Sequence, residues 1–151
     1  MTDNFTAQFD DFIKKVENRI VVVTKTAISL TAEEMQTPVS KGGKMRVDTG
    51  FLRASAMASI NSLPYGETRG RKRASGEVGV LSQYEMTDAT KQGPVDLLIN
   101  EAQSGDTVYF GWTASYARLR EIYDGFVASS TQNWQKHVDE ATKMIKRKVG
   151  E

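Results

Sequence analysis

Residues 47–60, VDTGFLRASAMASI, pose the first question about the fold, because a polar pair and a glycine stand directly before an apolar run. Asp48 or Thr49 can accept hydrogen bonds from the free N–H groups of a following helical turn. The run then places apolar residues at steps of four: Leu52, Ala56 and Ile60. This spacing is typical of one face of a helix. The stretch therefore predicts a capped helix, and taken alone it indicates scaffolding.

Upstream of this stretch, apolar residues recur at steps of three and four. They are Phe5, Phe9, Phe12, Ile13, Val16, Ile20, Val23, Ala27 and Leu30. The pattern predicts a helix from about Asn4 to about Gln36, closed by Pro38. At about 1.5 Å per residue it would be on the order of 45 to 50 Å long, more than one small domain covers. We expect most of the stripe to be core and part of it to face another chain.

Within that helix, the β-branched run IVVV at 20–23 is equally typical of a strand. After residue 60 the periodicity changes, and glycine-bounded segments favour strands. INSLPYGE (60–67) and GEVGVLS (76–82) suit a hairpin, and TVYFGW (107–112) alternates most clearly. These segments predict a small sheet.

Two more helical segments flank the clearest strand. Residues 83–105 form an expected insertion, in which Pro94 begins a short helix that covers a sheet edge or a neighbouring subunit. The segment SYARLREIYDG predicts a helix that ends at Gly125. The last helix is expected from about Ser129 to Lys148, with one apolar side: Trp134, Val138, Ala141 and Ile145.

These elements predict an α+β fold, with a long N-terminal helix and a C-terminal helix packed on a small, mostly antiparallel sheet. At 151 residues, the length fits one domain over residues 1–151. Loops without periodicity near 38–47 and 64–76 are expected to be mobile.

Composition limits the function. Twenty Lys and Arg residues against nineteen Asp and Glu residues give a formal net charge of +1, too little for the field of a dedicated nucleic-acid binder. The chain has no cysteine, and no apolar run approaches the roughly 18 to 20 residues that span a bilayer. We therefore expect a soluble protein made in a cytoplasm, without membrane contact. One local basic cluster stands out as candidate DNA-facing residues: Arg69, Arg71, Lys72 and Arg73.

No pattern of residues predicts catalysis. His137 is the only histidine, and no serine or acid stands at a spacing that suggests a triad, so we interpret it as structural or solvated. Phosphate-loop, dinucleotide and zinc-protease motifs do not occur. We expect no catalytic residue, cofactor or metal site, and no enzyme. A hydrolase assembled from dispersed carboxylates stays open as an alternative, although the sequence offers no coherent set.

The order of four segments resembles the minor tail or neck proteins of long-tailed bacteriophages. The segments are VDTGFLRAS, a strand-rich middle, VYFGWTASYARLREIYDGF and NWQKHVDEATKMI. The residues that carry the resemblance are Thr49, Gly50, Leu52, Arg53 and Ser55, followed by Tyr116, Ala117 and Glu121. Many members follow the glutamate with a Gly-Thr turn and a proline-rich loop, whereas Glu121 is followed here by IYDGF.

The resemblance implies a non-enzymatic structural protein of the virion, made in the host cytoplasm. Such a tail-completion protein forms a six-fold or twelve-fold ring at the head–tail junction or tail end. It joins connector and tail proteins around a channel through which DNA passes without sequence recognition. Motif order also suggests that Arg53 pairs with Glu121 and that Trp134 belongs to an interface. The alternative is a nucleic-acid-binding module that uses residues 69–73, with Tyr65 nearby.

Overall fold

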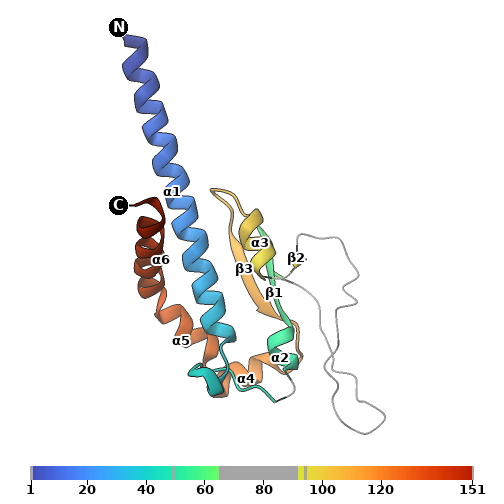
Figure 1. The fold of residues 1–151 in the computed structure, drawn as a ribbon. Coiled ribbons are helices and arrows are strands. Elements are labelled where there is room, and N and C mark those ends of the chain that lie inside the picture. The colour runs from blue at the N-terminus through green and yellow to red at the C-terminus, as the bar shows by residue number, and fades with distance from the viewer. Residues whose placement is uncertain (1, 49, 65–91, 94, 151) are drawn as a thin grey trace.

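The computed structural model describes residues 2–48, 50–64, 92–93 and 95–150 (Figure 1). Its elements, in chain order, are α1 (Thr2–Gln36), η1 (Val39–Lys41), α2 (Phe51–Ala54), β1 (Ala56–Ile60), β2 (Gln92–Gly93), α3 (Val95–Glu101), β3 (Val108–Trp112), α4 (Ala117–Asp124), α5 (Phe126–Gln132) and α6 (Trp134–Val149). Long terminal helices and a small antiparallel sheet confirm the predicted α+β class.

Helix α1 is one continuous element, as its apolar period predicts, and the IVVV run at 20–23 is helical. The β-branched residues lie within an unbroken helical stripe, and that longer pattern outweighs their local strand preference. Figure 1 shows the N-terminal half of α1 projecting beyond the rest of the molecule, while its C-terminal half packs along α6. Ala27 of α1 and Ala141 of α6 are fully buried, and such small residues let two helices approach closely.

The stretch 47–60 corrects the first prediction. Only a single helical turn, α2, forms, and the chain continues as the strand β1. The turn ends at Ser55, whose hydroxyl donates a hydrogen bond to the carbonyl oxygen of Leu52 over 2.7 Å. The carbonyl oxygen of Ser55 then accepts the backbone N–H of Thr113 over 3.0 Å, which starts pairing with the next strand. Pairing partners distant in sequence therefore decide against the predicted longer helix.

The sheet has the order β2-β1-β3, and both pairings are antiparallel. Ala58 of the central strand pairs with Phe110 on one side and Gly93 on the other. The predicted strand at TVYFGW is confirmed as β3. The predicted strand INSLPYGE is wrong over residues 61–64, which lie outside any strand, and the remainder of that hairpin lies outside the described residues.

Helix α3 confirms the short helix expected in the 83–105 segment. It covers the sheet of its own chain and also contacts α1. The buried cluster between these elements comprises Ala32, Ala58, Ile60, Val95, Leu98, Ile99 and Ala102. This packing accounts for Val95, Leu98 and Ile99 of the helix, which are buried.

A second buried cluster forms beside the lower end of the sheet in Figure 1, where α2, α4 and α5 gather. It comprises Met45, Phe51, Leu52, Ala114 and Phe126, with Trp112, Ala117 and Val127 packed against it. Trp112 and Phe126 meet edge to face, with ring centroids 5.0 Å apart. This cluster joins the loop after α1 to the C-terminal helices.

The mobility of residues 38–47 stays a prediction; within this loop Met45 is fully buried, and Val39 donates its N–H to the Met45 carbonyl oxygen over 3.0 Å. One further prediction needs correction. The predicted helix from Ser129 to Lys148 is divided at Asn133 into α5 and α6. The Asn133 side chain donates a hydrogen bond to Glu34 over 2.7 Å, so a tertiary contact accompanies the break. Of the predicted loop 64–76, only Pro64 is described.

Candidate interface: the projecting helix and the arginine groove

The projecting half of α1 exposes large apolar side chains. The exposed fractions are 73% for Phe5, 54% for Phe9, 63% for Phe12 and 59% for Ile20. Every side chain described from residue 5 to residue 20 is exposed. The expectation that most of the stripe is core is therefore wrong, because the helix is longer than the structure that packs against it. We name Phe5, Phe9, Phe12, Ile13, Val16 and Ile20 the projecting stripe.

The projecting stripe is a single surface, since its members recur with the helical period. Phe5 and Phe9 are stacked one turn apart, with ring centroids 6.4 Å apart. An apolar surface of this kind on a monomer usually marks an interaction site.

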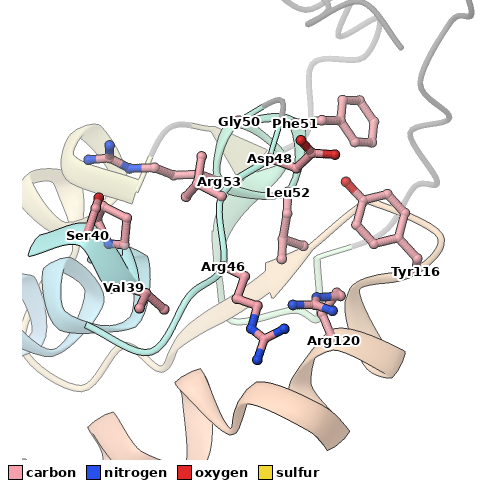
Figure 2. Close-up of a pocket in the computed structure, with 12 residues that line it drawn as sticks. Val39, Ser40, Arg46, Asp48, Gly50, Phe51, Leu52, Arg53, Tyr116 and Arg120 are labelled. Carbon is pink, nitrogen blue, oxygen red and sulfur yellow. The ribbon is translucent and has the colours of Figure 1, made fainter. Parts of the chain in front are cut away.

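A groove lies near the opposite end of α1, just after the helix ends. Its walls are formed by residues 38–40, by residues 46–48 and 50–53, and by the start of α4 with Tyr116. Its volume is about 860 Å³. Among the described residues, Arg46, Arg53 and Arg120 line it together with one acid, Asp48, so cations prevail (Figure 2). We name it the arginine groove.

Two of its arginines share a carboxylate. Asp124 accepts a hydrogen bond from Arg120 over 2.6 Å, and the Nε of Arg46 lies 3.6 Å from the other carboxylate oxygen. The Asp124 side chain is only 4% exposed, whereas that of Arg46 is 75% exposed. The buried carboxylate therefore positions two guanidinium groups at the groove and neutralises part of their charge.

Tyr116 forms part of the wall opposite residues 38–40. Its ring lies against that of Phe51, with centroids 6.0 Å apart. Desolvation by burial raises the pKa of the Tyr116 hydroxyl, the nearby Asp48 carboxylate raises it further, and Arg120 opposes the shift. Figure 2 shows the Asp48 carboxylate and the Tyr116 hydroxyl turned toward each other. Tyr116 therefore offers a neutral hydroxyl at the groove surface.

The structure brings together the two segments that carry the phage resemblance. Gly50, Leu52 and Arg53 from the first segment and Tyr116 from the second line the arginine groove. Leu52 is buried, and Ala117 packs against its cluster. Gly50 has φ +79°, a left-handed conformation that favours glycine at the entry to α2. Thr49, the predicted cap, lies outside the described residues.

The predicted pair between Arg53 and Glu121 is wrong. Both oxygens of Glu121 are used elsewhere: they accept the backbone N–H groups of Val127 and Ala128, over 2.8 and 2.9 Å. The first turn of α5 has free N–H groups and the positive end of the helix dipole, which a carboxylate satisfies. Glu121 thus holds α4 to α5, while Arg53 stays exposed at the groove.

The other predicted site residues lie apart from this constellation. Trp134 begins α6, is 41% exposed and does not line the groove. The basic cluster at 69–73 lies outside the described residues, so its contact with DNA stays a prediction. The lone histidine, His137, is buried and contacts Glu34, which agrees with a structural role.

Sequence reasoning missed Arg46, Arg120 and Asp124. The spacing of Arg120 and Asp124, one helical turn apart, is a signal that predicts their pairing on α4. The contribution of Arg46 has no such signal, because it comes from a loop far away in the sequence. Its place depends on the burial of Met45 beside it.

Within the described ranges, no group of three or more His, Asp or Glu side chains is placed to hold a metal ion. None of the helices in the same ranges combines the length and apolar character needed to cross a membrane. Comparison of the chain with protein families, curated proteins and solved structures found no match.

Proposed function

We propose that this chain is a non-enzymatic structural protein of a phage virion, which assembles into a ring through its N-terminal helix. The single observation that carries the proposal is the projecting stripe, an exposed apolar surface on a helix that extends beyond its own domain. The order of the motif segments supports the placement at the head–tail junction or tail end. Connector and tail proteins are the proposed neighbours, and DNA passes through the ring without sequence recognition.

The size of the stripe favours assembly of moderate strength. Burying a fully exposed large apolar side chain contributes about 1.5 to 3 kcal/mol. The most exposed members of the stripe, Phe5, Phe9, Phe12 and Ile20, are 54 to 73% exposed, so together they offer about 4 to 7 kcal/mol. Association costs on the order of 4 to 15 kcal/mol in lost freedom. The two ranges overlap, and we therefore expect self-association that depends on concentration and is reinforced by neighbouring virion proteins.

Light scattering coupled to gel filtration, over a range of concentrations, tests the assembly. The purified chain should form larger species as concentration rises, and Phe9→Asp should shift the distribution toward monomer. Asn18→Asp is the matched control, because Asn18 lies on the opposite side of the same exposed helix. Equal behaviour of the two variants would remove the stripe from the proposal.

A second experiment tests the place in the virion. The gene is inactivated in the phage that encodes the chain, and the particles are imaged by electron microscopy. Full heads without attached tails, or tails that end incorrectly, are the expected result. Complete particles, together with absence of the chain from purified wild-type virions by mass spectrometry, would contradict a virion role.

A further inference from the structure

We propose that the arginine groove of one copy receives the projecting helix of a second copy, so that subunits join head to tail. This inference rests on the proposed function and deepens it, because it names the two surfaces that meet. The donor is the stripe segment around Phe5, Phe9 and Phe12. The acceptor is the groove wall that contains Val39 and Arg53 together with Tyr116.

The helix cannot occupy the groove of its own chain. Residues 38–40 of the groove directly follow the C-terminal end of α1. Phe5 lies 31 residues earlier than Gln36 on one continuous helix, which places the two about 45 Å apart. Figure 1 shows the N-terminus and the α2–α4 region at opposite ends of the molecule. Any projecting helix in the groove must therefore come from another copy.

The groove offers apolar surface to an aromatic helix. Val39 is 55% exposed, Val47 is 45% exposed and Tyr116 is 39% exposed, although all three are apolar or aromatic. Exposed Phe side chains on the donor and partly exposed apolar side chains on the acceptor are both removed from water by one contact. A helix laid in a groove by residues one turn apart is a common mode of recognition.

The charges of the two surfaces are also complementary. Residues 2–13 contain three Asp residues, including Asp10 and Asp11, and no Lys or Arg. The groove presents Arg46, Arg53 and Arg120 against Asp48. Asp124 neutralises part of the charge of Arg46 and Arg120, so Arg53 is the cation that the described carboxylates leave unpaired. No ion-pair partner of Arg53 lies in the described part of the chain, and Figure 2 shows this side chain extending toward the side where Ser40 and Val39 lie. An acidic helix is therefore attracted to this groove.

The side chains that line the arginine groove favour a protein ligand over nucleic acid. Phosphate recognition needs cations on a polar surface, whereas Val39 and Val47 expose apolar side chains within the groove. A nucleic-acid ligand is the alternative that the experiment must distinguish.

Donor and acceptor surfaces at opposite ends of one subunit produce a heterologous contact. Each copy then gives its helix to one neighbour and receives a helix from the other. Contacts of this type generate closed rings when the rotation between subunits closes. The inference therefore supplies the kind of contact that a ring of this chain requires.

Mixing two defective variants tests the head-to-tail arrangement by light scattering. The donor variant is Phe9→Asp/Phe12→Asp, and the acceptor variant is Val39→Asp/Arg53→Glu, which changes only exposed side chains. Each variant alone should be monomeric where the wild type assembles. Their mixture should form dimers and nothing larger, since one intact donor and one intact acceptor remain. Arg118→Glu, at an exposed position outside the groove, is the matched control and should assemble like the wild type.

Oxidative cross-linking detects the contact even where assembly is weak, because the natural chain contains no cysteine. Phe9→Cys/Val39→Cys should give a ladder of disulfide-linked oligomers, and Asn18→Cys/Arg118→Cys should not. A ladder no stronger than that control overturns the inference. Wild-type assembly by the Val39→Asp/Arg53→Glu variant also overturns it, while leaving the ring proposal intact. Salt-sensitive binding of duplex DNA that is lost in this variant, without a ladder, would assign the groove to nucleic acid instead.

Discussion

The Nε2 atom of His137 lies 2.5 Å from an oxygen of Glu34, and this contact joins the last turns of α1 to the start of α6. The second oxygen of Glu34 accepts a hydrogen bond from the Asn133 side chain. The Glu34 carboxylate therefore contacts both Asn133 and His137, which lie at the junction between α5 and α6. The only histidine of the chain is held by a carboxylate about a hundred residues away, in a position that fixes how the terminal helices pack.

Glu34→Ala is expected to destabilise the fold. It leaves the buried His137 imidazole and the Asn133 amide without their acceptor, which costs about 1 to 3 kcal/mol. Urea unfolding followed by circular dichroism measures the loss. Glu33→Ala, at the exposed neighbouring position, is the control and should change stability by less than about 0.5 kcal/mol. Equal losses at both positions would contradict the structural role of the contact.

Glu121→Ala should reduce the stability of the fold by about 1 to 2 kcal/mol, because it removes the acceptor for two N–H groups at the start of α5. Arg53→Ala should have little effect. A double-mutant cycle of both changes should give a coupling free energy near zero, since the two side chains do not pair. A coupling free energy above about 0.5 kcal/mol would restore the pair that motif order suggested.

Two glycines should respond differently to alanine. Gly50 has a positive φ, and a methyl group added to it would meet no atom of the described residues within 4 Å, so Gly50→Ala should cost about 1 to 2 kcal/mol through backbone strain alone. At Gly43 the added Cβ would lie 1.9 Å from the Thr37 carbonyl oxygen. Gly43→Ala should therefore be the more damaging change. Thermal unfolding of both variants decides the order, and the reverse order would contradict the loop geometry.

Tyr116 should make stability fall in alkaline solution. Its pKa is raised in the folded chain by desolvation and Asp48, so the unfolded chain loses this proton first as the pH rises. The contribution of Tyr116 to the free energy of unfolding is therefore intact below the ordinary tyrosine pKa of about 10 and is lost as the pH rises above it. Tyr116→Phe should flatten the fall in urea midpoint above about pH 10. An unchanged slope would contradict this assignment.

Removal of residues 1–18 should leave the folded domain nearly unchanged. Described side chains up to Ile20 are exposed, and the first fully buried side chain described in α1 is Ala27. We expect the melting temperature to shift by no more than about 1 to 2 °C, while self-association is lost. A large drop in melting temperature would show that the projecting half supports the domain itself.

Local periodicity was sufficient to predict several elements. The 3.6-residue stripe gives α1 its length, and the alternation of TVYFGW identifies β3. Pro94 indicates the start of the short helix α3. Gly125, in the left-handed conformation, ends α4 where the sequence indicates. Each of these features depends only on residues that are near one another in the sequence, so the sequence alone is sufficient to predict it.

The segment AMASI (Ala56–Ile60) shows that apolar periodicity alone does not distinguish a buried strand from a helix. Residues 57–60 are all buried, so this central strand has no exposed polar face and no alternation that separates it from a helix. Pairing with β2 and β3, which are distant in sequence, determines its conformation. The hydrogen-bond partners of Glu121 are likewise set by tertiary structure, because they depend on how α4 and α5 meet.

By itself, the sequence determined the helical stripe of α1, the strand at 108–112 and the glycine at the entry to α2, because each follows from local spacing or backbone conformation. Only the tertiary structure decided that the first half of the stripe is exposed and that three arginines meet at one groove. Exposure and side-chain partnership depend on which surfaces the remainder of the chain covers. That coverage is set by contacts between distant residues, which a local pattern does not contain.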